Sequence, residues 1–410
     1  MIANSNEQMS AIVNARIFDG VNIISGSNRA VLIKGRYIEA VTDKLPEKTR
    51  IIDAKGATLI PGLIDSHVHT DIGGLCDALK FGVTTELEMM GRWTKKQREQ
   101  IAGRDDIADL RSPGMGATPK GGHPTEYASQ SLLNRLFVRY LFPFVQTPRQ
   151  AVKFVNKQIS SGADYIKIFI EDGSCIGYPG LAELDDATIR AAIDEAHRHN
   201  KLTIAHVTTA DATHRAISAG IDGLGHLFFD CNSNPALIER IAKSGVFVIP
   251  TTVTLSSAFG NTAADLAADS RVSSKLSKEW LSSLSRSMNV YPKGKLENAF
   301  AAIKALHSCG VDILAGSDVS EPTPELGGLA HGASLHHELQ LLAAAGLKPI
   351  EALRCAAFTP AKRFALSDRG SISAGKLADL VLIEGNPMDC ISDTLSIRTV
   401  WRHGAVLQAQ

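Results

Sequence analysis

Several features that would place the chain in a broad class are missing from its 410 residues. No apolar run is long enough to span a bilayer, and residues 1–14 lack the cationic start and apolar core of a signal peptide. The 43 basic residues are balanced by 43 acidic ones, so no overall field favours nucleic acid or a membrane surface. These absences predict a soluble, cytoplasmic globular protein, and composition predicts nothing further.

Paired cysteine motifs are also absent. Six cysteines are scattered without any Cys-x-x-Cys spacing: Cys76, Cys175, Cys231, Cys309, Cys355 and Cys390. This pattern is typical of a reduced compartment and argues against a zinc site built from thiolates. No Gly-x-Gly-x-x-Gly turn follows a first strand, which counts against an open, doubly wound nucleotide-binding sheet. Neither an internal repeat nor a low-complexity linker is present.

The middle of the chain alternates strand-like and helix-like stretches. Apolar runs typical of buried strands occur at 59–70, 82–87, 110–117, 164–170, 202–206, 222–226, 246–251 and 312–316. Strands alternating with helices predict a parallel sheet, and eight such units fit a closed (β/α)8 TIM barrel of the α/β class. The interval 263–306 is rich in Ser and Ala and predicts a helical excursion near the barrel mouth.

The residue pattern at both ends of the chain differs from that of the middle. Short strand-like runs and turns occupy residues 10–55 and reappear after residue 376. We therefore predict one small β-sandwich domain built from both termini. The expected boundaries are 1–58 for its first part, 59–368 for the barrel and 369–410 for its second part.

His67 and His69 stand at the carboxyl end of the first predicted barrel strand. Side chains two residues apart on a strand share a face, so both imidazoles point the same way and could hold one ion. His197 and His199 have the same spacing but lie in a stretch with helical periodicity. Residues two apart on a helix diverge by about 200°, which predicts that this second pair binds no ion.

Other candidate ligands lie on or at the ends of later strands: Lys167, His206, His226 and Asp318. Lys167 is set in a run of β-branched and aromatic residues, and a buried ammonium without a partner is costly. It therefore needs a carboxylate, such as Asp164 or Glu171, or a chemical modification. Plainer roles are a satisfied core histidine for His206 and a helix cap for Asp318.

The ordered set His-x-His, Lys, His, His and Asp resembles the amidohydrolase superfamily. The run 61–69 is similar to the signature of that family, and so is the tail at 374–380. Within it the chain most resembles the binuclear branch that includes Xaa-Pro dipeptidases, acyl-amino-acid hydrolases and ochratoxin-hydrolysing amidases. In that branch the lysine is carboxylated by carbon dioxide, and its carbamate holds two metals together.

The resemblance assigns a role to each candidate. His67, His69 and Asp318 would hold one ion, His206 and His226 a second, and carbamylated Lys167 would join the two. Nitrogen and oxygen ligands favour two zinc ions, with manganese, cobalt or iron as alternatives. A hydroxide shared by the metals would attack the amide carbonyl, with Asp318 as general base and then acid.

A second group of residues is expected to contact substrate. His123 follows the third strand and His331 the last, and we assign both to catalytic or substrate-binding roles, including stabilisation of an oxyanion. Tyr127 and Tyr178 are further candidates for the substrate pocket. A plain surface loop around His123 and ordinary packing of the aromatic residues are the alternatives.

Three functions compete at this point. The first is metal-dependent hydrolysis of an amide in a dipeptide, an N-acyl amino acid or an ochratoxin-like conjugate. The second is a mononuclear deaminase or lactonase, which would leave Lys167 without a role, and the third is a non-catalytic scaffold, which the complete ligand set disfavours. The substrate is not fixed by the sequence, and a homo-oligomer is expected by analogy alone.

Overall fold

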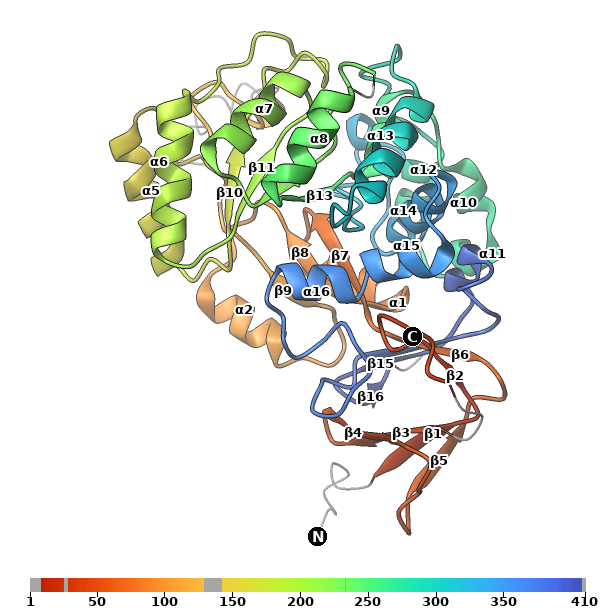
Figure 1. Ribbon diagram of the computed structural model, residues 1–410. Coiled ribbons are helices and arrows are strands. Elements are labelled where there is room, and N and C mark those ends of the chain that lie inside the picture. Colours follow the sequence, from red (N-terminus) through yellow and green to blue (C-terminus); the bar gives the residue numbers. More distant parts are fainter. Residues whose placement is uncertain (1–8, 26–28, 129–141, 233, 408–410) are drawn as a thin grey trace.

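The computed structural model describes residues 9–25, 29–128, 142–232 and 234–407. The fold is α/β, with β-structure from both ends of the chain gathered below a larger part in which strands and helices alternate (Figure 1). Among the helices of the described ranges, none is both long and apolar enough to cross a bilayer.

Two sheets form the smaller part. The first has the order β4 (Tyr37–Thr42), β3 (Ala30–Lys34), β1 (Ser10–Val13), β5 (Arg50–Asp53). The second has the order β16 (Ala405–Val406), β15 (Ile397–Arg402), β14 (Leu380–Ile383), β6 (Thr58–Pro61), β2 (Arg16–Ile17). Since β14 pairs directly with β6, the two ends of the chain share one sheet. An apolar cluster that includes Ile12, Leu59 and Trp401 packs in this part.

Within the stretch 59–70, which the sequence predicts as one strand, the structure has two strands in two sheets. The stretch is divided at Gly62, between β6 and β7 (Leu63–Val68). A Cβ at Gly62 would lie 2.2 Å from Oγ1 of Thr84, so a larger residue would not fit at this crossing. The single-strand expectation is wrong because apolar runs look alike whichever sheet they join.

The larger part contains two parallel sheets. One has the order β7, β8 (Val83–Glu88), β9 (Asp109–Arg111), and the other β10 (Ile166–Phe169), β11 (Thr203–His206), β12 (Gly223–Gly225), β13 (Phe247–Ile249). Single parallel pairings connect them: Ala117 with Ile168, Val248 with Ile313, and Val68 with Val319.

The predicted eighth strand, 312–316, does not form a regular strand. Ile313 and Val319 make isolated pairings, and the segment between them turns toward β7. The hydroxyl and amide of Ser317 donate to the carboxylate of Asp65 at 2.6 and 3.0 Å. Backbone bonds to β7 also run along this segment, since the amide of Ser66 donates to the carbonyl of Ala315 at 2.9 Å and the amide of His69 to the carbonyl of Val319 at 2.7 Å.

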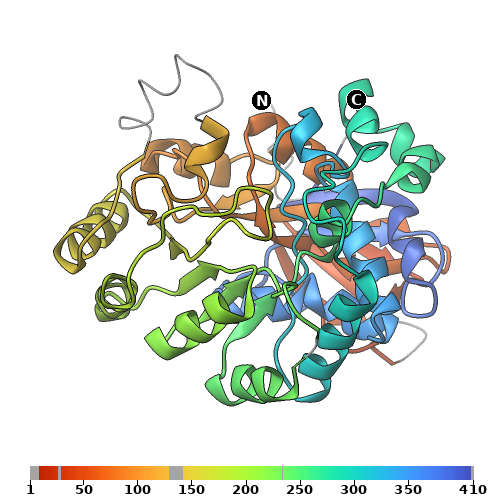
Figure 2. The ribbon, with the colours of Figure 1, turned by 90° about the horizontal axis from the view of Figure 1, so that it is seen from above.

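Helices lie on the outside of the parallel sheets (Figure 2). Those that precede residue 250 are α1 (Ile72–Lys80), α2 (Lys95–Ala102), α3 (Thr125–Ala128), α5 (Pro148–Ser160), α6 (Asp186–Arg198), α7 (Ala210–Ala219) and α8 (Pro235–Ser244). In α5, Thr147 caps the amino end, Pro148 occupies the first turn, and Ala151, Phe154 and Val155 form the buried stripe. Capping and periodicity together explain why this segment is helical.

The remaining helices follow β13. They are α9 (Thr252–Ala258), α10 (Ala264–Ala268), α11 (Ser270–Ser273), α12 (Lys278–Leu284), α13 (Leu296–Ser308), α14 (Ala333–Ala344), α15 (Pro349–Cys355) and α16 (Phe358–Arg363), with short 3-10 turns at Pro324–Leu326 and Ile391–Leu395. The interval 263–306 is therefore largely helical, as its composition predicts. An inner apolar cluster includes Ile64, Ile204, Phe247 and Leu314 from successive strand positions, and Phe364 packs with it.

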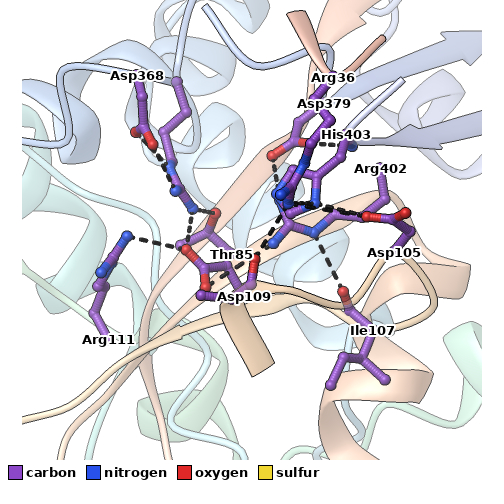
Figure 3. A network of polar contacts seen from close by, with 12 residues as sticks. Arg36, Thr85, Asp105, Ile107, Asp109, Arg111, Asp368, Asp379, Arg402 and His403 are labelled. Carbon is purple, nitrogen blue, oxygen red and sulfur yellow. Dashed lines mark hydrogen bonds and ion pairs between the residues drawn. The ribbon is translucent and has the colours of Figure 1, made fainter. Parts of the chain in front are cut away.

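A buried ion network joins the larger part to the C-terminal segments (Figure 3). Asp109 on β9 accepts from Nη1 of Arg369 at 2.5 Å, and its other oxygen lies 3.9 Å from Nη2 of Arg402. Arg402 also pairs with Asp379 at 2.7 Å. Arg369, Arg402 and Asp109 are all buried, so the network depends on each charge having its partner.

Candidate active site

Three predicted ligands meet at the ends of the strands. Nε2 of His67 and Nε2 of His69 lie 3.3 and 3.4 Å from Oδ1 of Asp318. All three ligand atoms fall within 4.8 Å of one another, which is close enough to hold a metal ion. Gly316 permits this approach, since a Cβ there would lie 2.8 Å from Cβ of His67.

Two further imidazoles adjoin this group. Nε2 of His226 lies 4.0 Å from Oδ2 of Asp318 and 3.1 Å from Nδ1 of His206. The ring centroids of His67 and His226 are 4.6 Å apart. The fold thus brings together all four histidines that the sequence selects as ligands, and His206 presents Nδ1 rather than Nε2 to the group.

Lys167 lies at the centre of the cluster without a hydrogen-bond partner. Its side chain is 1% exposed, and Nζ finds no acceptor among the described residues. A Cβ at Gly225 would lie 2.9 Å from Nζ and 3.1 Å from Cε1 of His67, so the glycine leaves room for the lysine tip beside the imidazoles. The predicted alternative, an ion pair with Asp164 or Glu171, does not form.

The electrostatics favour the neutral form at His67, His226 and Lys167, whereas at His69 burial is outweighed by the contacts with Asp318 and the charge of Glu88, and the net pKa shift is upward. Burial, reinforced by the nearby charge of Lys167, holds the pKa of His67 well below its usual range. Burial also lowers the pKa of His226 to about 3 and that of Lys167 to about 7, against the opposing charge of Asp318. A neutral imidazole has a lone pair for a metal, and a neutral amine is a nucleophile. The donor set therefore fits divalent metals.

Backbone strain is concentrated in the same place. Asp318, His226 and Thr251 have positive φ angles of 55°, 97° and 46°. A β-branched residue such as Thr251 rarely adopts this conformation, which costs about 1–3 kcal/mol. Its Oγ1 lies 2.7 Å from Nδ1 of His226, so the strained turn places a partner behind a candidate ligand.

Behind the ligands lie two polar residues that sequence reasoning missed, Glu88 and Thr251, and a third, Glu171, that it considered only as a partner for Lys167. Glu88 ends β8, and its Oε1 lies 4.0 Å from Nδ1 of His69. Glu171 follows β10 and meets His206, while Thr251 follows β13 and meets His226. Each stands at or just after a predicted strand, so the rule that selected the histidines would have found these residues had it been applied to carboxylates and hydroxyls.

A cavity of about 660 Å³ opens over the cluster. Its lining includes all four predicted substrate residues, His123, Tyr127, Tyr178 and His331. The ring of His123 stacks against His206 with centroids 4.4 Å apart. Apolar and aromatic side chains make much of the remaining described wall, among them Phe142, Phe229, Leu255, Trp280, Met288 and Val290.

Both ring nitrogens of His331 contact polar groups of the protein, which the sequence does not suggest. His331 is 2% exposed, with Nδ1 3.3 Å from Oε1 of Glu86 and Nε2 3.3 Å from the carbonyl of Ser320. Burial lowers its pKa, but the charge and hydrogen bond of Glu86, the charge of Asp65 and the carbonyl of Ser320 together outweigh burial, and the net shift is upward. His331 therefore ties the segment after Asp318 to β8 and borders the cavity with its ring.

His197 and His199 lie apart from the cluster, as predicted from their helical setting. His197 in α6 pairs with Asp222 at 2.8 Å, and His199 at the end of that helix faces Glu195 at 3.4 Å. The two side chains have different partners at the molecular surface and share no site.

Parallel strands whose ends present imidazoles, a carboxylate and a buried lysine define the class: an α/β protein with a candidate metal centre. The chain belongs to the amidohydrolase family, whose model matches residues 58–408. This is a family of hydrolases that is generally metal-dependent, and the resemblance deduced from the motifs is confirmed.

Curated relatives are distant. Ochratoxinase of Aspergillus niger is 24% identical over 274 residues, which cover 64% of this chain and 50% of the ochratoxinase. A dihydroorotase of Elusimicrobium minutum is 39% identical over 85 residues, 18% of this chain and 19% of that enzyme. The chain thus spans half or less of the length of these relatives.

Solved structures agree over nearly the whole chain. A Xaa-Pro dipeptidase with bound methionine in its active site superposes with a TM-score of 0.77 at 20% identity, covering 98% of this chain and 100% of the other. The A. niger ochratoxinase structure gives a TM-score of 0.73 at 19% identity, with 98% and 96% covered. Similarity at this level establishes a shared fold.

Proposed function

We propose that the protein is a binuclear metal-dependent amidohydrolase that cleaves an amide bond of a small molecule. The observation that carries this proposal is Lys167, which is buried beside the candidate ligands and whose Nζ has no hydrogen-bond partner within the described ranges. A role as a carbamate resolves that cost: neutral Nζ attacks the carbon of carbon dioxide, an N–C bond forms and a proton leaves to solvent. The resulting anion would supply oxygen ligands where an ammonium would repel metals.

The residues divide between two positions. His67, His69 and Asp318 would hold one ion, His206 and His226 the other, and carbamylated Lys167 would contact both. Zinc suits this nitrogen and oxygen set best, with manganese, cobalt or iron as alternatives. When bound, two such ions lower the pKa of water and polarise a carbonyl.

The chain's own groups complete the reaction. The carboxylate of Asp318 would accept the proton of the attacking water and return it to the departing amine. His123 borders the cavity beside His206 and would stabilise the negative charge that develops on the amide oxygen. Tyr127 and Tyr178 would contact the substrate, and the apolar wall favours a substrate with an apolar or aromatic portion.

We further propose that the two parallel sheets and the residues that connect them form an eight-stranded (β/α)8 barrel. The connecting pairings and the inner apolar cluster support this. The domain boundaries at 58 and 368, and a homo-oligomeric state, remain predictions, although β6 extends to Pro61 within the smaller part.

Metal content tests the central proposal. Protein purified without chelator and in the presence of bicarbonate should contain close to two divalent ions per chain. Lys167→Ala should lose most of this metal together with amidase activity on dipeptides and N-acyl amino acids. Two ions retained by the variant would refute the carbamate.

A mononuclear deaminase or lactonase is the second candidate. It is favoured by the compact group of His67, His69 and Asp318, which by itself supplies three ligands. One ion per chain, unchanged in Lys167→Ala, would select this candidate instead.

A further inference from the structure

Glu171 is a buried carboxylate in direct contact with a candidate ligand. It is 2% exposed, and its Oε2 lies 3.2 Å from Nε2 of His206. The same oxygen accepts from the hydroxyl of Thr208 at 2.5 Å, and Oε1 accepts from the amide of Gly173 at 2.8 Å. A carboxylate only accepts hydrogen bonds, so this arrangement favours a proton on Nε2 of His206.

The other nitrogen of His206 then carries the lone pair. Nδ1 faces the cluster, 3.1 Å from Nε2 of His226. A neutral imidazole has one donor and one acceptor nitrogen, so whatever fixes the proton on Nε2 also fixes Nδ1 as the ligand atom. Glu171 thus decides which side of the ring is available.

Glu171 also connects this ligand to the cavity wall. The amide of Gly173 donates a hydrogen bond to the carboxylate of Glu171. Gly173 also begins a turn, in which its carbonyl accepts from the amide of Tyr178 at 3.0 Å. Gly173 has a φ of +81°, and a Cβ there would lie 1.9 Å from the carbonyl oxygen of Tyr178. Two hydrogen bonds of Gly173 therefore connect Tyr178, at the cavity, with the carboxylate that meets His206.

We propose that Glu171 is a positioning residue that fixes the tautomer of His206, and thereby sets the affinity of the second metal position but not of the first. The inference rests on the proposed binuclear function. The first position is independent of Glu171 because its ligands lie elsewhere: His67 on β7, His69 directly after that strand, and Asp318 in the segment before residue 320.

Glu171→Gln tests this, because the amide has almost the same shape but can also donate. Its NH2 group can face Nε2 and move the proton to Nδ1, which removes the lone pair from the cluster. Loss of a partner behind a metal ligand typically lowers affinity 10–100-fold. Glu195→Gln is the matched control, since Glu195 is a buried carboxylate that pairs with Asn156 and Arg198 in another part of the chain.

The experiment is a calorimetric titration of zinc into metal-free protein in bicarbonate buffer. Wild type and Glu195→Gln should bind two ions, and Glu171→Gln should retain the first while binding the second at least about 10-fold more weakly. Nitrogen-15 spectra of histidine-labelled, metal-free protein should show His206 protonated at Nε2 in wild type and no longer uniformly so in the variant. Glu171→Asp, which retracts the carboxylate, should weaken the same ion and serves if the Gln variant does not fold.

Two results would overturn the inference alone: two tight ions in Glu171→Gln with an unchanged His206 tautomer, or equal weakening of both ions. Fewer than two ions in wild type would instead refute the binuclear function and the inference with it.

Discussion

Replacing Asp109 by alanine removes only one carboxylate group, but it should destabilise the protein strongly. Asp109 is 1% exposed and stands between two buried guanidinium groups, those of Arg369 and Arg402 (Figure 3). The substitution leaves both cations in a medium of low polarity. Neither arginine can reach solvent, because they are 6% and 0% exposed.

The structure also limits how much free energy of unfolding the Asp109→Ala variant should lose. Breaking a buried ion pair by removing one partner costs about 3–5 kcal/mol. Arg369 keeps Asp368 and Arg402 keeps Asp379, so we expect the lower end, about 3 kcal/mol. That is a large share of the roughly 5–15 kcal/mol that stabilises a typical domain.

The assay is equilibrium unfolding in urea followed by circular dichroism. The control is Asp106→Ala, which breaks an ion pair with Arg104 in which the Asp106 side chain is 61% exposed. Exposed pairs contribute about 1 kcal/mol or less, so this variant should unfold close to wild type. If Asp109→Ala loses no more free energy of unfolding than the control, the network has no special role and the reasoning is refuted.

The difference in free energy of unfolding between wild type and Asp109→Ala should disappear at acid pH. Burial raises the pKa of Asp109, but the charges of Arg369, Arg111 and Arg402 outweigh it, and the net pKa lies below the usual value. The stability that Asp109 contributes is therefore fully present above its pKa in the unfolded chain, about 3.9, and is lost as pH falls through its pKa in the folded protein. The difference should be constant from about pH 5 to 8 and shrink only below about pH 4.

Three shorter predictions concern the site. Asp318→Asn should bind the first ion at least about 100-fold more weakly and abolish hydrolysis, as measured by metal titration and turnover; normal activity would exclude its role as ligand and base. Thr251→Val removes the hydroxyl 2.7 Å from Nδ1 of His226 and should weaken the second ion about 10-fold, which competition with a chelator can measure. Gly316→Ala places a methyl 2.8 Å from Cβ of His67 and should cost about 1–3 kcal/mol of stability together with metal; full metal content at wild-type stability would contradict this.

The ligand set could be predicted because it depends on local rules. Strand periodicity puts His67 and His69 on one face, and parallel strands bring their carboxyl ends to one edge. Lys167 could be selected because a buried ammonium without a partner is costly in a strand of apolar residues. The family followed from the order of these residues, and the match over residues 58–408 confirms it.

Other features were beyond local rules. The run 59–70 divides at Gly62, where a Cβ would lie 2.2 Å from Oγ1 of Thr84, and the segment after Ile313 carries Ser317, which bonds to Asp65. Both depend on residues distant in the sequence. Apolar periodicity records whether a residue is buried but not what buries it.

What the sequence determined by itself is the chemistry of the centre: imidazoles, a lysine and a carboxylate, spaced for one edge of a parallel sheet. What only the tertiary structure decided is how these groups are held. Glu171 pairs with His206 rather than with Lys167, whose Nζ has no hydrogen-bond partner in the part of the chain that the structure describes. Partner choice depends on distances of a few ångströms between segments far apart in the chain, and those distances exist only once the fold has formed.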